Sequence, residues 1–428
     1  MANNQLRRIA IIGGVRIPFC RSNSFYADES NQDMLAAALQ GLVERFDLQG
    51  EKIDEVIGGA VTVHSKDWNL TREAVLSTDL SPLTPGVTLQ QACGTSLQSA
   101  MILGAKIASG QIDSGIACGS DTTSDAPIVF SRKFAQRMIK LSQARTMKDR
   151  FKVFKGFSFS ELAPQPPQNS EPRTGLSMGQ HCERMVKEWG VTREAQDQLA
   201  YNSHQNAHAA WEDGEFDDMV VPYAGVTRDN NIRPDTTLEK MGTLRTVFDR
   251  KNGSLTAANS TPLTDGASSI LLASEEWAKA HNLPVQAYLT FSRNAAVDFV
   301  EDEGLLMAPA VAMSEMLQAA DLSLQDFDFY EIHEAFAGQV LCTLKAWDDE
   351  AFCTQRLGLD KKLGTIDMDK LNVVGGSVAM GHPFAATGAR VMSTLAHLLE
   401  KKGSGRGLIS ICTAGGMGVT AILERPEA

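Results

Sequence analysis

Residues 93–119 read CGTSLQSAMILGAKIASGQIDSGIACG, and this stretch does most to set the expected fold. A helix-like apolar run follows the opening turn, ends at Gly110 and leads into a short apolar strand pattern. Residues 382–416, HPFAATGARVMSTLAHLLEKKGSGRGLISICTAGG, show the same order of turn, buried helix, glycine, strand and reactive residue. This similarity predicts two copies of one α/β unit, although many α/β proteins share that order.

The segments before the first copy also alternate between strand and helix patterns. Arg8–Gly14 reads as a buried strand that ends in a glycine turn, Met34–Phe46 as a helix and Ile53–Val63 as a second strand. The alternation continues to about residue 125 and predicts an α/β domain with a largely parallel sheet.

The residue composition and the hydrophobic pattern of the chain change from Ser124 to about Arg250. This part is polar, contains Pro164-Gln165-Pro166-Pro167 and has little strand pattern, so we expect a mainly helical insertion. Strand patterns return after Gly253, at residues 269–273, 285–291, 327–332, 371–374, 408–411 and 419–423.

Composition narrows the functional classes. The 428 residues suffice for about two or three domains, and a net charge of −12 argues against a broad nucleic-acid-binding face. Seven cysteines without a CxxC pair fit neither a disulfide framework nor a structural zinc site. The apolar run Ile9–Ile12 is too short for a signal peptide, and no run is long enough for a spanning helix. We therefore expect a soluble cytoplasmic protein with reduced thiols.

Two residues stand out as candidates for chemistry. Cys93 opens a helix, where the helix dipole and free amide groups would lower the pKa of its thiol and favour the nucleophilic thiolate. A buried structural cysteine is the alternative. His382 lies between the glycine-rich run Gly375–Gly381 and Pro383, a frame that would aim an imidazole base at one atom.

Two further segments could support such chemistry. Cys412 ends a strand and precedes the turn Ala414–Gly418, whose backbone amides could hold an oxyanion, although a plain hairpin turn fits as well. His333 lies between Glu331 and Glu334, where an acid and a histidine could orient a water or a carbonyl. The spacing around His333 is not that of a zinc motif, and the chain has neither a Walker loop nor a GxGxxG that follows a strand.

Taken in order, four segments resemble the signatures of the thiolases. They are Cys93-Gly94-Thr95-Ser96, His333-Glu334-Ala335-Phe336, Gly381-His382-Pro383 and Cys412-Thr413-Ala414-Gly415-Gly416-Met417-Gly418. The resemblance implies two βαβαβαββ halves in a five-layer α-β-α-β-α core with an inserted, mainly helical loop domain. It places the halves at residues 1–285 and 286–428 and the loop domain at about 124–250.

The resemblance also implies an activity and a set of site residues. Cys93 would attack a 3-oxoacyl-CoA, His382 would take its proton, and Cys412 would protonate the departing acetyl-CoA carbanion. One oxyanion hole would consist of His382 and a water held by His333, and the other of the backbone amides of Cys93 and Ala414. Coenzyme A would be a substrate, with no bound cofactor and no metal. The implied contacts for substrate and CoA are Ser260, Thr261, Phe336 and Met178, although Thr261 could equally be a turn residue before Pro262.

Some positions depart from the commonest thiolase pattern. His333 stands where many thiolases have asparagine and resembles the β-subunits of fatty acid oxidation complexes, while Ser96 and Ala414 replace glycines. This branch implies degradation of 3-oxoacyl-CoA, a homodimer or dimer of dimers, and a hydratase/dehydrogenase α-subunit as partner. The cysteine and two histidines also resemble decarboxylating ketoacyl synthases, but Cys412 argues against that reading. Acetoacetyl-CoA synthesis and a noncatalytic acyl-CoA or lipid-binding protein are the remaining alternatives.

A basic segment at residues 128–156 contains nine lysines and arginines and a single acid, Asp149. Phe130, Phe134, Met138 and Leu141 recur there at helical spacing, which is typical of a basic amphipathic helix on an anionic membrane. A helix packed on the core with solvated charges, docking of a partner protein, and attraction of the CoA phosphates are the alternatives.

Overall fold

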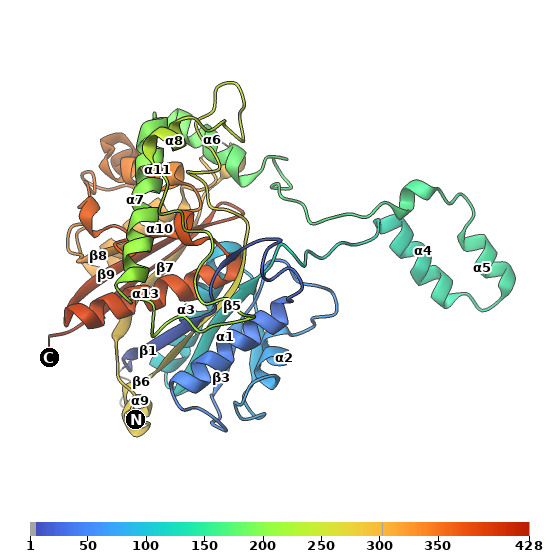
Figure 1. Cartoon of the computed structure of the whole chain (residues 1–428), viewed down its shortest axis with the longest axis horizontal. Helices are drawn as coiled ribbons and strands as arrows, with labels where there is room; N and C mark the ends of the chain where they lie inside the picture. Colours follow the sequence, from blue (N-terminus) through green and yellow to red (C-terminus); the bar gives the residue numbers. More distant parts are fainter. Residues whose placement is uncertain (1–5, 302, 428) are drawn as a thin grey trace.

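The computed structural model describes residues 6–301 and 303–427 (Figure 1). The strands of the N-terminal half are β1 Ile9–Arg16, β2 Cys20–Arg21, β3 Glu55–Gly58, β4 Gly86–Thr88, β5 Ser114–Asp121 and β6 Thr264–Ser274. Its helices are α1 Asn31–Arg45, α2 Leu70–Leu76, α3 Thr95–Ala108 and α9 Glu275–Ala280. A single turn of 3₁₀ helix, η1 Ala92–Gly94, directly precedes α3.

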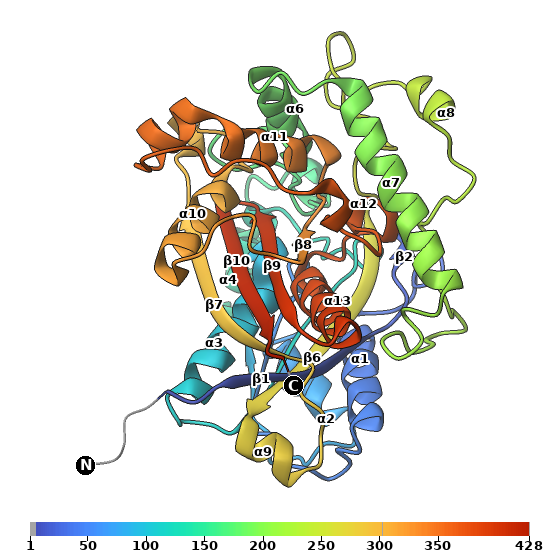
Figure 2. The ribbon, with the colours of Figure 1, turned by 90° about the vertical axis from the view of Figure 1, so that its left-hand side faces the viewer.

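The C-terminal half repeats this plan. Its strands are β7 Ala287–Ala296, β8 Phe329–Ile332, β9 Gly405–Thr413 and β10 Met417–Arg425. Its helices are α10 Ala308–Ala320, α11 Ala337–Asp348, α12 Ser377–Met380 and α13 Thr387–Lys402. Figure 2 looks onto this half, where β7, β10 and β9 lie side by side.

Helices α3 and α13 form the central layer of the molecule. Their apolar side chains share one core cluster with residues of β1, β5, β6, β9 and β10, so the two helices lie between the two halves of the sheet. Helices α1 and α2 cover the outer face of the N-terminal strands, and α10 and α11 cover that of the C-terminal strands. The five-layer α-β-α-β-α core that the sequence predicted is confirmed.

The sheet itself differs from the largely parallel one expected. It runs in the order β4-β3-β5-β6-β1-β7-β10-β9-β8, and only the pairs β3–β4, β3–β5 and β8–β9 are parallel. Strand β6 enters from the insertion and pairs antiparallel with both β1 and β5, so no crossover helix sets its direction. Pairing of Ala10 with Tyr288 and of Ile11 with Ala287 joins the two halves into one sheet.

The strand expected at residues 371–374 does not form. Leu371 makes only an isolated bridge to Tyr330, and positive φ angles at Asn372 (46°) and Gly375 (84°) turn the chain away. The Asn372 side chain replaces the missing strand, because its amide accepts from the N–H of Ile332 and donates to its carbonyl at 3.0 and 2.9 Å.

The insertion divides into two parts. Helices α6 Met178–Glu188, α7 Arg193–Glu212 and α8 Leu238–Gly242 pack on the C-terminal half through side chains such as Met185 and Leu199. Helices α4 Arg132–Gln143 and α5 Met147–Val153 lie at the end of a stalk that projects from the body (Figure 1). We call residues 128–169 the arm; paired backbones at Val129 and Gln165 close its stalk. Among the described residues, no helix is long and apolar enough to cross a membrane.

Candidate active site

Cys93 lies in the tight turn that precedes α3. Ala92 adopts a φ of 46°, and the turn η1 then places Cys93 against β9 at the start of α3. A Cβ on the neighbouring Gly94 would lie 2.7 Å from Val419 and 2.9 Å from Thr413, so only glycine lets this turn approach the strands. Cys93 as a whole is 8% exposed.

The protonation state of Cys93 differs from the expectation. Burial raises the pKa of its thiol to about 12, although hydrogen bonds from the backbone N–H groups of Ala414 and of Cys93 itself lower it. Burial outweighs the helix terminus, so the prediction of a lowered pKa was wrong for the resting protein. The thiol is neutral and needs a base before it can act as a nucleophile.

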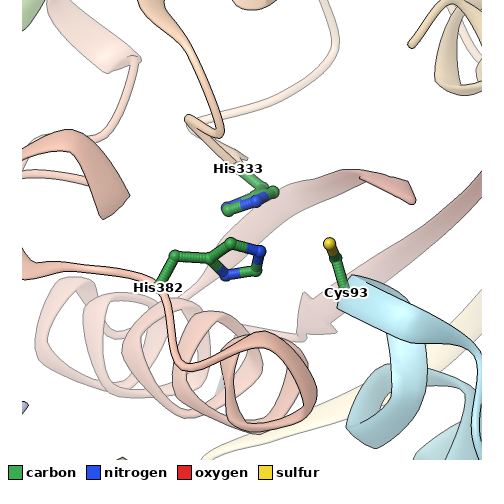
Figure 3. A group of neighbouring side chains, drawn as sticks. All are labelled: Cys93, His333 and His382. Carbon is green, nitrogen blue, oxygen red and sulfur yellow. The ribbon is translucent and has the colours of Figure 1, made fainter. Parts of the chain in front are cut away.

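Two buried histidines face this thiol (Figure 3). One ligand atom of each of Cys93, His333 and His382 lies within 4.8 Å of the others, and the ring centroids of the histidines are 4.1 Å apart. The Nε2 atoms of both histidines are buried and have no hydrogen-bond partner among the described residues. Such atoms are available to a substrate or, because sulfur and imidazole suit zinc, to a metal ion.

Hydrogen bonds select the tautomer of His382. Its Nδ1 lies 2.5 Å from the Thr387 hydroxyl, which in turn donates to the carbonyl of Pro383 at 3.2 Å. Because the hydroxyl hydrogen is used there, Nδ1–H of His382 donates to the Thr387 oxygen, and Nε2 keeps a free lone pair. Burial, together with the charge of Arg390, lowers the pKa of His382 to about 3. His382 is thus a neutral base aimed at the thiol.

His333 takes the opposite tautomer. Its Nδ1 lies 2.8 Å from the Ser377 hydroxyl, whose oxygen accepts a hydrogen bond from the Arg390 guanidinium at 2.8 Å. The Ser377 hydroxyl hydrogen has no other acceptor among the described residues, so we assign it to Nδ1, which places the proton of His333 on Nε2. Burial, His382 and Arg390 hold the pKa of His333 well below its usual value. The pair presents one acceptor and one donor to the same space.

Cys412 lies on β9 close to Cys93. It is 1% exposed and pairs with Gly418, and burial plus the nearby Cys93 hold its pKa well above the usual value. The turn that follows does connect β9 to β10 as a hairpin, and it also presents the Ala414 N–H to the Cys93 sulfur. The hairpin interpretation of this turn is therefore confirmed, and its role in holding an oxyanion stays a prediction.

A cavity of about 610 Å³ is lined by the insertion, by residues 21–23 of the N-terminal half, by Val378, and by the segment that contains Ser260 and Thr261. Thr261 donates to the carbonyl of Ser377 at 2.7 Å, which links the cavity wall to the residue that holds His333. The Ser260 hydroxyl is buried without a partner among the described residues. Phe336 packs edge-on against Phe248 in the cavity lining.

Comparison with known proteins identifies the family. A model of the thiolase N-terminal domain matches residues 9–276, and one of the thiolase C-terminal domain matches residues 284–425. The chain belongs to the thiolase family. It is 41% identical to a 3-ketoacyl-CoA thiolase of Serratia proteamaculans over 423 residues, 97% of both chains, and 40% identical to one of Alteromonas mediterranea with the same coverage.

Solved thiolase structures show the same fold. A Bacillus anthracis acetyl-CoA acetyltransferase superimposes with a TM-score of 0.81 at 30% identity, over 99% of this chain and 100% of that one. Human mitochondrial 3-ketoacyl-CoA thiolase in complex with CoA gives a TM-score of 0.81 at 26% identity, over 98% of both chains.

Two buried acids support the thiolase site in ways that the sequence interpretation did not predict. Glu334, considered there as a group that might orient a water, instead accepts hydrogen bonds from Ser203, Asn372 and the backbone of Val378 at 2.6 to 3.1 Å. Glu334 therefore holds the first turn of α12, which contains Ser377, in place. Asp121 accepts from the backbone of Ala385 at 2.8 Å and fixes the loop after His382 in the same way.

Met178 is less directly placed. It opens α6 and packs on the C-terminal core cluster, and it is not among the residues that line the 610 Å³ cavity. Thr387 and Ser377, which set the two histidine tautomers, were also missed, although Ser377 lies in the glycine-rich run Gly375–Gly381 and Thr387 lies five positions after His382.

Proposed function

We propose that this thiolase is a degradative 3-ketoacyl-CoA thiolase, an acetyl-CoA C-acyltransferase that shortens 3-oxoacyl-CoA by two carbons. The observation that carries the proposal is that two buried histidines with unpartnered Nε2 atoms face a neutral thiol. The tautomers assigned from their Nδ1 partners give His382 a lone pair and His333 a proton on that side. Carbon–carbon cleavage by a cysteine needs a base for the thiol and a donor for the developing oxyanion.

In the first half-reaction, Nε2 of His382 takes the Cys93 proton as the sulfur attacks the keto carbon. The newly protonated His382, together with a water held by His333, would hold the oxyanion. The bond between the second and third carbons then breaks, leaving an acyl thioester on Cys93, and the acetyl-CoA carbanion takes the proton of Cys412.

In the second half-reaction, the Cys412 thiolate takes the proton of the incoming CoA thiol, which attacks the thioester. The backbone N–H groups of Cys93 and Ala414 hold the second oxyanion, consistent with their hydrogen bonds to the Cys93 sulfur. Loss of the shortened acyl-CoA returns a thiolate to Cys93, and His382 gives back its proton. Both sulfurs and both histidines end in their starting states.

We assign CoA to the cavity beside Ser260 and Thr261. Arg21 and Arg233 also line it and supply positive charge for phosphate groups. The single lining histidine, His204, is neutral because burial lowers its pKa to about 4. Phe336 and Met178 would then contact the acyl part of the substrate from the C-terminal side.

The direct test is CoA-dependent thiolysis of 3-oxoacyl-CoA substrates of short, medium and long chain. Cys93→Ala should abolish turnover, whereas Cys353→Ala, which removes a buried thiol that contacts the carbonyls of Ala346 and Trp347 in α11, should leave it unchanged. No turnover by the parent, or full turnover by Cys93→Ala, would refute the mechanism. Incubation with acetyl-CoA alone measures the alternative synthesis of acetoacetyl-CoA, and CoA binding without turnover would indicate a noncatalytic binding protein.

We also propose that the arm contacts an anionic membrane surface. No described residue of α4 or α5 is buried, and Phe151, Phe159 and Met147 are exposed beside the basic side chains. Each lysine or arginine near an anionic bilayer contributes about 1 kcal/mol. Arg137 is not part of this surface, because it is tied to Glu161 and to the carbonyls of residues 153, 155 and 156 within the arm.

Flotation with anionic liposomes tests the arm. Reversal of Lys133, Lys140 and Lys148 to glutamate should abolish flotation, whereas reversal of Lys52, Lys66 and Lys361 on the body should not. Equal flotation of the two triple variants would exclude a membrane site and leave a protein partner, such as a hydratase/dehydrogenase subunit, as the occupant.

A homodimer is proposed on the edge strand β4. This strand ends the sheet with one side unpaired, and Val87, Leu83 and Trp68 nearby are 41%, 74% and 93% exposed. Pairing with the same strand of a second copy about a twofold axis would cover them. Light scattering should give a dimer or a dimer of dimers, and Val87→Lys with Trp68→Glu should shift it toward the monomer. The cytoplasm is our proposed compartment, consistent with seven free thiols.

A further inference from the structure

The turn that carries the Ala414 N–H has little stiffness of its own. Gly415 and Gly416 adopt φ angles of 79° and 70°, which side chains rarely tolerate, and a Cβ on Gly416 would lie 2.6 Å from Phe299. Glycine is required here, yet it is also the residue with the most backbone freedom to lose. A donor that must stay aimed at an oxyanion therefore needs anchors from outside the turn.

Two such anchors are present. The N–H of Val297 donates to the carbonyl of Gly416 at 2.8 Å, and the N–H of Gly415 donates to the Glu171 carboxylate at 2.9 Å. The Gly415 N–H belongs to the same planar peptide group as the Ala414 carbonyl. By holding this plane, Glu171 limits rotation about the bonds that orient the Ala414 N–H toward Cys93.

Glu171 is itself held in a closed hairpin, residues 170–177. Its N–H donates to the carbonyl of Leu176 at 2.9 Å, and its carbonyl accepts from Gly175 at 2.8 Å. Ser170 pairs with Ser177, and Ser177 caps α6 through a reciprocal capping box. The hairpin follows the arm in the chain and is anchored to the body through α6, which packs on α11.

We infer that Glu171 is a positioning residue for the backbone oxyanion hole of the thioester step, acting through Gly415 on the Ala414 N–H. The inference deepens the proposed function and rests on it. The Glu171 carboxylate accepts from the N–H of Gly415 and not from that of Ala414. The N–H of Ala414 therefore remains bonded to the Cys93 sulfur and available to the oxyanion. An uncharged acceptor of the same shape would hold the turn as well.

Three variants test the role. Glu171→Leu removes the acceptor and should lower kcat about 10- to 100-fold, with little change in KM for CoA, because a misaimed donor weakens the transition state more than binding. Glu171→Gln keeps an oxygen for Gly415 and should retain kcat. Glu350→Leu, at an exposed carboxylate outside the site, is the matched control and should behave as the parent.

The split between kcat and KM in Glu171→Leu, and its rescue in Glu171→Gln, are readouts that a merely structural role would not move. An unchanged kcat in Glu171→Leu, or equal losses in the Leu and Gln variants, would overturn the inference. An inactive parent would instead refute the proposed function.

Excision of the arm separates this role from docking. Val129 and Gln165 are paired, so a short Gly-Ser linker can replace residues 130–164 without moving the hairpin. The shortened chain should keep parental kcat while Glu171→Leu within it still loses activity. A loss of kcat on excision alone would show that the arm, rather than Glu171, supports the turn.

Discussion

Thr387→Val tests the tautomer assignment most directly. Thr387 is fully buried at the start of α13, and valine has nearly the same shape, so the change removes a hydroxyl without opening a cavity. The Nδ1–H of His382 then has no acceptor, and a buried unsatisfied donor costs about 1 to 3 kcal/mol. His382 can avoid that cost by moving its proton to Nε2, which destroys the base.

The size of the effect follows from that cost. If the unproductive tautomer gains about 1 to 3 kcal/mol, the share of molecules with a free Nε2 lone pair falls, and kcat/KM falls about 5- to 150-fold. The hydroxyl also donates to the carbonyl of Pro383, so we expect a loss of stability of about 1 kcal/mol as well. Thr387→Ser keeps the hydroxyl and should recover most of the activity.

Steady-state thiolysis, thermal unfolding and the rate of Cys93 alkylation measure these effects separately. Alkylation should slow in Thr387→Val, because the thiol loses its base, while thermal unfolding shows that the variant is folded. A kcat/KM within about twofold of the parent would refute the tautomer assignment. A serine variant as impaired as the valine variant would refute it too.

Acid pH, a buried glycine and Zn²⁺ each give a further test of the site. The unfolding free energy should fall as the pH drops below about 6.5, because His382 stays neutral in the folded state to about pH 3. The fall should be at most about 1.4 kcal/mol per pH unit for His382. Equal pH slopes in the parent and His382→Asn would contradict this. In urea unfolding, Gly376→Ala should destabilise by about 1 to 3 kcal/mol, since its Cβ would lie 2.3 Å from the Glu334 carboxyl, whereas Gly242→Ala should be tolerated because its Cβ meets nothing within 4 Å. Zn²⁺ should inhibit thiolysis and protect Cys93 from alkylation until a chelator is added. Unchanged rates would show that the ligand atoms of Cys93, His333 and His382, which lie within 4.8 Å of one another, do not bind a metal ion.

The reactive residues could be predicted from the sequence immediately around them. Cys93, His333 and His382 each lie in or beside a turn whose glycines, proline or acids are neighbours in the chain, and the structure brings all three together. Burial is different, because it depends on strands from both halves that pack over η1. For this reason the sequence predicted a lowered pKa for Cys93 where the structure has a raised one.

Contacts between residues far apart in the chain could not be predicted from the sequence. Glu171 reaches Gly415 across 244 positions, and no local pattern distinguishes it from other surface acids. The failed strand at residues 371–374 has a similar cause: its apolar pattern suits a strand, but the Asn372 side chain takes the strand's hydrogen bonds. Thr387 was closer to reach, since it lies five positions after His382 at a helix start.

The pairing of β1 has a consequence for synthesis of the chain. Its partners, β6 and β7, are about 250 residues or more further along, so the apolar strand Ile9–Arg16 leaves the ribosome long before either exists. At about 5 to 20 residues per second, that delay is roughly 12 to 50 s. During that time the first strand exposes apolar side chains and unpaired backbone groups to other molecules in the cell. We expect nascent chains to engage chaperones through this strand, and expression in heterologous hosts to depend on translation speed before β6.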